Sequence, residues 1–251
     1  MATILVGSDT GSAAYIGRKH EDCREVGIAA QDLRLPETIS AHDLGAHVDA
    51  MNADEAVHGF LVQLPLPPHL EDSAFLARVD PGKDIDGLHP ENLGRLMQGA
   101  PTILPCTPAG ILELLRHHGV PLAGRQVVIV GRGALVGRPL SMLLSRRGID
   151  ATVTLAHGKS GDLARITRGA DIIVSATGVP GLIRAEMVRA GAAVVGVGIS
   201  RDARGEMLSD IADEVGEVAG WVTPRHGSVG ALTRAMLLRN LLDLAETRRV
   251  A

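Results

Sequence analysis

A buried strand that runs directly into a glycine turn is the feature that most constrains this chain. Residues 127–130 read Val-Val-Ile-Val, and residues 131–137 follow as Gly-Arg-Gly-Ala-Leu-Val-Gly. Residues 138–147 then fit a helix that ends at Gly148, and another strand-like run begins at Ala151. This order lets backbone amides approach a pyrophosphate at the positive end of a helix dipole. The segment therefore predicts a dinucleotide site, and glycines that only permit tight packing are the alternative.

The residues beside this turn bear on which dinucleotide binds. The spacing Gly-x-Gly-x-x-x-Gly is one residue longer than the commonest fingerprint. Residues 157–160, after the second strand, read His-Gly-Lys-Ser and contain no acid to hold an NAD ribose. Lys159 suits a 2′-phosphate, which favours NADP over NAD, unless it is only a solvated turn residue. Two further turns, Thr177–Pro180 and Gly196–Ile199, close later strands at the same edge.

Short apolar runs rich in β-branched residues alternate with helix-length stretches along the chain. The runs are Thr3–Val6, Gly59–Leu64, Gln126–Val130, Ala151–Ala156, Asp171–Ala176 and Ala193–Ile199. This alternation is typical of parallel sheets with helices on their faces, so the predicted fold class is α/β. Apolar residues make up 45% of the 251 positions, which is enough for the cores of two small lobes with a cleft between them.

A helix is expected to bridge the two lobes. Residues 105–108 read Pro-Cys-Thr-Pro and precede an apolar helical pattern over residues 109–118. Thr107 fits the N-cap, Pro108 the first helical position and Gly119 the stop.

The last helix is predicted over residues 229–248, where apolar side chains recur at steps of three and four, and it is expected to return to the first lobe. We therefore divide the chain into a first lobe, residues 1–120 plus 229–251, and a doubly wound, Rossmann-type second lobe, residues 121–228.

Composition excludes several classes of protein. The net charge of -4, with dispersed Lys and Arg residues, provides no basic field for a nucleic-acid partner. The two cysteines have neither metal-ligand spacing nor the number of a disulfide framework, which fits a reducing cytoplasm and predicts no metal site. No run of 18 apolar residues and no signal-like start occur, so we expect an untargeted cytoplasmic protein without a membrane partner.

Polar residues stand out in the first half of the chain. Gln63 lies inside an apolar strand that stops at prolines, so its amide is either a structural bracket or a support for another polar group. Asp84 and Asp86 lie on one side of an extended segment, or in a solvated loop. Tyr15 and Lys19 share a face if their segment is helical, although a surface lysine beside a tyrosine is the plainer interpretation.

Taken together, these segments resemble the methylenetetrahydrofolate dehydrogenase/cyclohydrolase family (FolD type) over nearly the whole chain. The motifs that carry the resemblance are Ser12-x-x-Tyr15-x-x-x-Lys19, Val62-Gln-Leu-Pro-Leu-Pro67, Pro81-x-Lys-Asp-Ile-Asp-Gly-Leu-His-Pro90, Leu104-Pro-Cys-Thr-Pro-x-Gly110, Gly131-Arg, Val136-Gly-x-Pro139, Val197-Gly-Ile199 and Val229-Gly-x-x-Thr233. The resemblance implies oxidation of 5,10-methylenetetrahydrofolate to the methenyl form with NADP, NAD being the alternative cofactor. It also implies hydrolysis of the methenyl form to 10-formyltetrahydrofolate, and a homodimer through the second lobe.

The resemblance also implies roles for single residues. Lys19 matches the catalytic lysine, Gln63 its partner, Tyr15 the aromatic that stacks on the benzoyl ring of folate, and Asp86 the carboxylate that grips the pterin. A lysine that moves protons near neutrality needs a lowered pKa, which desolvation or a neighbouring dipole can provide. A glutamine in an apolar strand is a means of holding such a lysine. Further substrate contacts are implied at Leu64, His226 and Gly227, and cofactor contacts at Thr107, Gly131, Arg132, Gly133, Val136, Gly137, His157, Gly158, Lys159, Thr177, Gly178, Gly198 and Ile199.

The sequence departs from the family pattern in four places. The family normally has an extra helix before the strand that Thr3 opens here, and serines where this chain has Gly133 and Gly158. Residues 224–233 read Pro-Arg-His-Gly-Ser-Val-Gly-Ala-Leu-Thr instead of a glycine-rich loop that lies by the reacting groups. These differences put NADP affinity, the substrate and the balance of the two activities in question.

Two other functions stay open on the sequence. One is a specialised paralogue with a single activity or a modified one-carbon carrier, which the altered loop favours. The other is a catalytically silent folate- or nucleotide-binding protein. Retention of Tyr15, Lys19, Gln63 and Asp86 together argues against the silent protein, because binding alone does not need the lysine.

Overall fold

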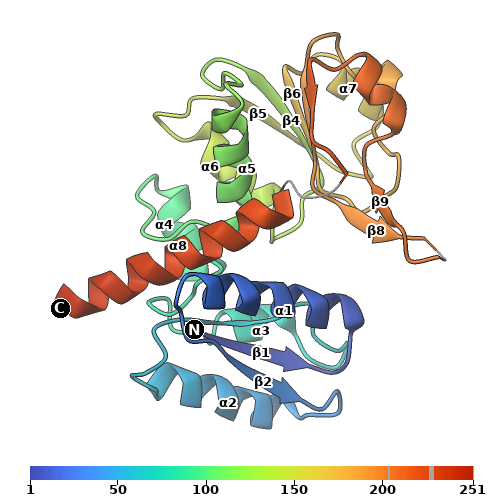
Figure 1. Ribbon diagram of the computed structural model, residues 1–251. Helices are drawn as coiled ribbons and strands as arrows, with labels where there is room; N and C mark the ends of the chain where they lie inside the picture. Colours follow the sequence, from blue (N-terminus) through green and yellow to red (C-terminus); the bar gives the residue numbers. More distant parts are fainter. Residues whose placement is uncertain (203, 226–228, 251) are drawn as a thin grey trace. The chain divides into compact units, whose positions relative to one another are not determined.

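The computed structural model describes residues 1–202, 204–225 and 229–250, which form two compact units (Figure 1). The first unit comprises Met1–Arg95, Pro101–Cys106 and Arg234–Ala251, and the second comprises Leu96–Ala100 and Thr107–Thr233. The α/β class is confirmed. The predicted division differs at residues 96–100, 107–120 and 229–233, which belong to the second unit.

A three-stranded parallel sheet with the order β2-β1-β3 organises the first unit. Its strands are β1 (Ala2–Val6), β2 (Gln31–Leu35) and β3 (Phe60–Val62). The central strand β1 is buried along its whole length, which explains its continuous apolar composition. The sequence analysis missed β2, because this edge strand exposes most of its Gln-Asp-Leu-Arg-Leu side chains and carries a weak pattern.

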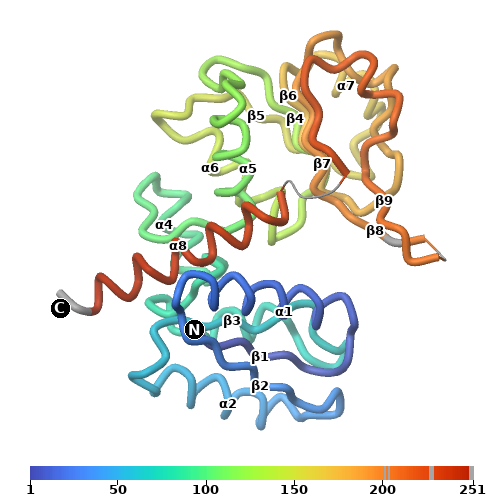
Figure 2. Tube along the Cα trace, viewed as in Figure 1, coloured from blue at the N-terminus to red at the C-terminus, as the bar shows by residue number. Residues whose placement is uncertain are grey.

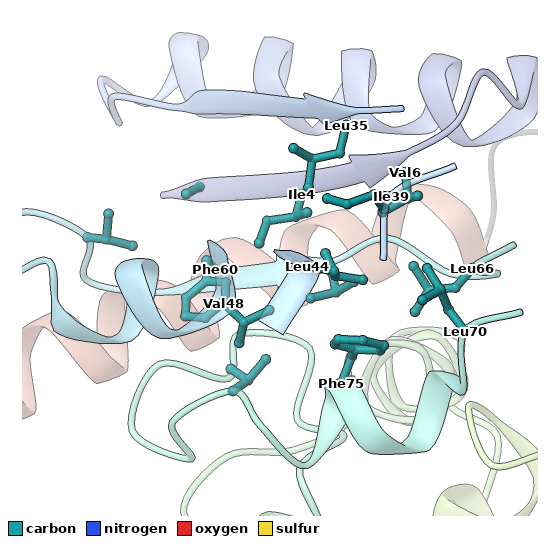
Figure 3. Close-up of a cluster of buried hydrophobic side chains, with 14 residues drawn as sticks. Ile4, Val6, Leu35, Ile39, Leu44, Val48, Phe60, Leu66, Leu70 and Phe75 are labelled. Atoms are coloured by element: carbon teal, nitrogen blue, oxygen red, sulfur yellow. The ribbon is translucent and has the colours of Figure 1, made fainter. Parts of the chain in front are cut away.

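Four helices of this part of the chain connect or follow the strands, and a fifth comes from its end. They are α1 (Thr10–Glu25), α2 (Ala41–Ala53), α3 (Asp72–Leu76), α4 (Pro90–Met97) and α8 (Val229–Val250). The core between the sheet, α2 and α3 contains Ile4, Leu44, Val48, Phe60 and Phe75 (Figure 3). Full burial of such side chains contributes about 1.5 to 3 kcal/mol each.

One buried amide ties α8 to two loops of the first unit. Asn240 Nδ2 donates to Ile85 O at 2.9 Å and to Leu104 O at 2.8 Å, and it lies 3.4 Å from Cys106 Sγ. The Cys106 thiol also donates to Ile85 O, at 3.1 Å. A Cβ at Gly87 would lie 2.6 Å from the Leu104 carbonyl, so only glycine permits this approach. The loop around Ile85 is thus held from behind by side chains distant in sequence.

A five-stranded parallel sheet organises the second unit, in the order β10-β7-β6-β4-β5. The strands are β4 (Gln126–Val130), β5 (Thr152–Ala156), β6 (Ile172–Ser175), β7 (Ala193–Gly196) and β10 (Trp221–Val222); Figure 2 marks β7 inside the sheet. The chain leaves β4 for β5 on one side and later returns to β6 on the other. The carboxyl ends of β4 and β6 therefore form a topological switch point, as in other doubly wound sheets, which confirms the Rossmann-type arrangement.

The helices of the second unit are short. They are α5 (Cys106–His117), α6 (Gly137–Ser145), α7 (Leu163–Thr167), and the 3-10 turns η1 (Ala185–Met187) and η2 (Asp213–Glu217). An antiparallel hairpin, β8 (Ile199–Arg201) with β9 (Met207–Ser209), projects from the sheet (Figure 1). In the described part of the chain, no helix is long and apolar enough to cross a membrane.

Two local predictions were wrong in detail. The helix α5 begins at Cys106, so Thr107 lies inside its first turn and not at the N-cap. The single strand expected over Ala193–Ile199 ends at Gly196, because the chain turns there into the hairpin.

The Asn240 bracket predicts a specific loss of stability. Asn240→Leu keeps the side-chain volume but leaves the carbonyls of Ile85 and Leu104 without this donor, which should lower the free energy of unfolding by about 1 to 3 kcal/mol. Urea unfolding measures the change. Arg239→Leu, at the exposed neighbouring position, is the control and should change stability by less than about 0.5 kcal/mol. Equal losses for both variants would show that the bracket contributes nothing.

Candidate active site and cofactor edge

Lys19 lies on the buried face of α1. Ser12, Ile16, Lys19 and Cys23 recur at steps of three and four and are the buried residues of this helix. The helix starts where the Asp9 carboxylate accepts a hydrogen bond from Ser12 N at 2.7 Å, a regular N-cap. Lys19 is only 3% exposed, so the plainer interpretation of a surface lysine is wrong.

The side chain of Gln63 holds the Lys19 ammonium. Gln63 follows β3, where its backbone N donates to Ile4 O, and its Nε2 donates to Leu64 O at 2.8 Å. This fixes Oε1, which accepts a hydrogen bond from Lys19 Nζ at 3.3 Å. The same Nζ lies 4.8 Å from the centroid of the Tyr15 ring, within cation–π range. The amide therefore acts both as a bracket and as a support for another polar group.

The two aspartates of the extended segment have different environments. Asp84 is buried and accepts hydrogen bonds from Gly87 N at 3.0 Å, His89 N at 2.7 Å and Asn92 Nδ2 at 2.9 Å. Burial raises the pKa of the Asp84 carboxyl, and the bonds from Asn92 and His89 oppose that rise. Asp86 is half-buried and makes no ion pair within the described ranges. Asp84 is thus a structural residue, and Asp86 is the one that a ligand can reach.

A neutral thiol lies beside these groups. Burial raises the pKa of Cys106 well above its usual value, the charge of Asp86 acts in the same direction, and the charge of Lys19 opposes it. The backbone N of Cys106 donates to Asp86 O at 3.1 Å. Cys106 therefore stays protonated near neutrality and positions the segment that carries Asp86.

The third polar residue of the Lys-Asp-Ile-Asp motif, Lys83, has a structural role. It is 2% exposed, and its Nζ donates to Met51 O at 2.9 Å and to Asp54 O at 2.7 Å, at the end of α2. Burial lowers the pKa of Lys83. Lys83 thus satisfies helix-end carbonyls that would otherwise lack donors.

In the second unit, the three glycines after β4 serve different purposes. Gly131 has φ +115°, and a Cβ on it would lie 2.4 Å from Ala176 O after β6. A Cβ on Gly137 would lie 1.9 Å from Gly131 O. At Gly133 nothing lies within 4 Å of the Cβ position. Gly131 and Gly137 are therefore required for close packing at the switch point. Gly133, between them, leaves its backbone accessible to a ligand.

The turn after β5 places cations at the same edge. His157 N donates to Ser160 Oγ, and Lys159 N donates to His157 Nδ1 at 3.2 Å, which closes the turn tightly. The side chains of Lys159 and of Arg132, after β4, are both exposed. Nothing lies within 4 Å of the Cβ position of Gly158, so a serine would fit there, as it would at Gly133.

The remaining predicted cofactor residues lie at the ends of other elements. Val136 precedes α6 as its N-cap residue, and Gly178 has φ +70° in the loop after β6. Ile199 is 55% exposed at the start of β8. Thr107 Oγ1 accepts a hydrogen bond from Thr233 Oγ1 at 3.2 Å, which ties α5 to the first turn of α8.

The altered loop near the end of the chain is described only at its start. The Arg225 guanidinium pairs with Asp213 on η2, an exposed contact within the second unit. His226 and Gly227, predicted as substrate contacts, lie outside the described residues.

Sequence reasoning missed three groups that support these sites: Lys83, Asn240 and Asp210. The sequence did contain an indication that Lys83 is special. Only three of the 25 basic residues are lysines, namely Lys19, Lys83 and Lys159, and the others are arginines. The structure brings Tyr15, Lys19 and Gln63 together in the first unit, and the glycine turns together along one sheet edge in the second. Over the described ranges, no three His, Cys, Asp or Glu residues are grouped as a metal site.

Comparison with known protein families gives two matches that together cover most of the chain. Residues 1–86 match the catalytic domain of tetrahydrofolate dehydrogenase/cyclohydrolase, and residues 105–249 match the NAD(P)-binding domain of the same proteins.

Solved structures agree with these matches. The bifunctional FolD enzyme of Campylobacter jejuni is 40% identical, with a TM-score of 0.95 over 98% of this chain and 88% of that one. The Trypanosoma brucei enzyme, solved with NADP and an inhibitor, is 38% identical, with a TM-score of 0.94 over 100% of this chain and 87% of that one. The NAD-dependent dehydrogenase of Saccharomyces cerevisiae shares the fold at 20% identity, with a TM-score of 0.85 over 100% of this chain and 88% of that one.

The glycine geometry after β4 predicts unequal effects of alanine. Gly137→Ala forces a methyl group into the Gly131 carbonyl, and because both are backbone positions the turn must open, which should cost about 1 to 3 kcal/mol of unfolding free energy. Gly133→Ala, in the same loop, is the matched control and should be nearly neutral, because no described atom lies within 4 Å of its Cβ position. Urea unfolding compares them, and equal stabilities would contradict the assigned roles.

Proposed function

The chain belongs to the tetrahydrofolate dehydrogenase/cyclohydrolase family, and on this basis we propose that it oxidises 5,10-methylenetetrahydrofolate with NADP and hydrolyses the methenyl product to 10-formyltetrahydrofolate. The observation that carries the proposal is the buried Lys19 ammonium held by Gln63 and Tyr15, in the unit that matches the catalytic domain. A protein that only binds folate or nucleotide has no need to bury a lysine in this way, since the burial of a charge costs stability.

On the folate side, each residue has a distinct task. Asp86 accepts hydrogen bonds from the N–H groups of the pterin, a charge-assisted contact. Tyr15 stacks on the benzoyl ring, and Leu64 contributes the apolar wall beside Gln63. Lys19 moves the proton of the water that adds to the methenyl carbon, and Gln63 Oε1 keeps the amine oriented for that transfer.

On the cofactor side, open backbone at the sheet edge fits a dinucleotide. No atom of the described residues lies within 4 Å of the Cβ positions of Gly133, Gly158 and Gly178, so three neighbouring loops leave room for a pyrophosphate and ribose against bare backbone. When bound, NADP supplies the acceptor for the hydride that leaves the folate methylene. Arg132 and Lys159 provide positive charge for a 2′-phosphate. The fold by itself does not distinguish NADP from NAD, since the yeast protein of the same fold is NAD-dependent.

We further propose which unit binds which ligand, the oligomeric state of the protein and its location in the cell. The first unit binds the folate, and the second unit binds the cofactor. The protein is a cytoplasmic homodimer that pairs through the second lobe, from whose sheet the β8–β9 hairpin projects. His226 and Gly227 contact the substrate.

Removing the lysine amine should impair hydrolysis and leave cofactor binding unchanged. Lys19→Ala should lower the rate of methenyltetrahydrofolate hydrolysis by about 10² to 10⁴-fold, the usual contribution of general acid–base catalysis. The affinity for NADPH should stay within about twofold of wild type, because Lys19 lies in the first unit. Methenyl absorbance follows hydrolysis, and calorimetric titration follows NADPH.

Lys19→Arg is the matched variant, since it keeps a cation but cannot give up its proton near neutral pH. It should be nearly as slow as Lys19→Ala. Hydrolysis at the wild-type rate by either variant would remove Lys19 from the mechanism.

The cations at the sheet edge predict a preference between cofactors. The double change Arg132→Ala with Lys159→Ala should weaken NADP by about tenfold or more and NAD by less than about twofold, because only NADP carries a 2′-phosphate. Wild-type protein should prefer NADP, and its NADP affinity should fall selectively with salt as ions screen the contact. Equal wild-type affinities for both cofactors would show that these two residues are ordinary surface charges.

A further inference from the structure

A buried carboxylate lies behind the cofactor edge of the second unit. Asp210 follows β9 and is 1% exposed. Its Oδ2 accepts hydrogen bonds from Ser175 Oγ at 2.8 Å, Thr177 N at 2.8 Å and Thr177 Oγ1 at 3.1 Å. It has no cationic partner among the residues that the structure describes. Burial of an unpaired charge is unfavourable unless the charge is hydrogen-bonded, so these three bonds stabilise the carboxylate in its buried position.

The same carboxylate occupies the side-chain space of Gly198. A Cβ built on Gly198 would lie 2.2 Å from Asp210 Oδ2, 2.3 Å from Oδ1 and 2.4 Å from Cγ. The backbone N atoms of Val197 and Gly198 donate to Ser175 O, at 2.8 and 3.2 Å. The loops after β6 and β7 therefore meet at one point, and Asp210 contacts both. Gly198 is a glycine because a carboxylate fills the space where its side chain would be.

The neighbouring residues reinforce this arrangement. A Cβ on Gly196 would lie 2.9 Å from Ser209 Oγ and from Ile211 Cγ1, so the segment that carries Asp210 packs along both glycines of the β7 loop. Gly196 N also donates to Thr223 Oγ1 at 2.8 Å. The segment 209–211 thus has a fixed position relative to the sheet, and it transmits that position to the two loops.

We propose that Asp210 is a positioning residue for the nicotinamide cofactor, which sets the loops that carry Thr177 and Gly178 on one side and Gly198 and Ile199 on the other. The inference rests on the proposed function, in which the second unit binds the dinucleotide, and on the family resemblance, which implies cofactor contacts at these four residues. Asp210 acts through the loops: its Oδ2 accepts hydrogen bonds from Ser175 and Thr177, and its carboxylate packs against Gly198. A carboxylate suits this position better than an amide, because it presents only acceptors to the donors that surround it.

The test is a double-mutant cycle between Asp210 and Gly198. Asp210→Ala removes the acceptor, and Gly198→Ala forces a methyl group into the carboxylate. Each single variant should raise the dissociation constant for NADPH about tenfold or more, measured by calorimetric titration. In the double variant the methyl group enters space that Asp210→Ala has emptied, so its affinity should be no lower than that of Asp210→Ala alone. If the fold-losses of NADPH affinity in the two single variants instead multiplied in the double variant, the proposal would be overturned.

Two controls separate positioning from general damage. Ser175→Ala removes a bond to the same oxygen without touching either loop, and it should leave NADPH affinity within about twofold of wild type. Hydrolysis of methenyltetrahydrofolate, which consumes no nicotinamide cofactor, should proceed in all variants within about twofold of the wild-type rate. A parallel fall in hydrolysis and NADPH affinity would show damage to the fold and overturn the positioning role.

Asp210→Asn keeps the shape and one acceptor, and it carries the test if Asp210→Ala cannot be purified. It should raise the NADPH dissociation constant by about threefold, and wild-type affinity would overturn the proposal. Wild-type protein that binds no NADPH would refute the proposed function together with this inference. Wild-type protein that binds NADPH while all variants bind it equally well would refute the inference alone.

Discussion

Both units depend on one constraint of parallel sheets, which is that a chain reversing its winding direction leaves the carboxyl ends of two adjacent strands uncovered. In the first unit the reversal falls between β1 and β3, and in the second between β4 and β6. Gln63 follows β3, and Gly131 and Ala176 follow β4 and β6. The residues with candidate chemistry gather at these edges because the helices that cover the strands diverge there.

An uncovered edge needs support from behind, and buried polar groups provide it in both units. Asn240 fixes the loop that leads to Asp86. Asp84 accepts two hydrogen bonds from the backbone of that loop and one from Asn92 in α4, and Asp210 joins two loops of the second unit. Each of these groups is almost wholly buried, so each must satisfy its polar atoms within the protein. That requirement makes the loop positions stiff, because a shift of the backbone would leave a buried donor or acceptor unpaired. Glycines at positions 87 and 198 permit the close approach that these bonds need.

The sequence was sufficient for the fold class, the buried strands and the glycine turn. The strand predicted over Gln126–Val130 matches β4, and the last helix matches α8 within two residues at its end. Both have a strong local pattern of apolar residues. The edge strand β2 was missed because most of its side chains face solvent, so its sequence has no such pattern.

The support for the site could not be predicted, because it rests on contacts between residues far apart in the chain. Asn240 and Ile85 are 155 positions apart, and Asp210 and Ser175 are 35 apart. Nothing in the local sequence of either residue indicates a buried partner. Asp84 and Asp86 also have similar local sequences, and only the loop geometry makes one structural and leaves the other accessible.

Because lysine is rare in this chain, the positions where it occurs indicate which sites need an ammonium group and not a guanidinium. Apart from the exposed Lys159, the surface cations of this chain are arginines, whose guanidinium is always charged and pairs with carboxylates in a planar geometry, as at Arg78 and Asp49. An ammonium differs from it in two respects, since it is compact and it can lose a proton. Lys83 uses the first property, because its compact ammonium donates to both the Met51 and the Asp54 carbonyl at the end of a helix. Among the residues that the structure describes, the Lys19 Nζ lies near one amide oxygen and one aromatic ring and donates to no pair of carbonyls. Arginine cannot release a proton near neutral pH, so a lysine at this position fits the second property, the ability to take up and release a proton.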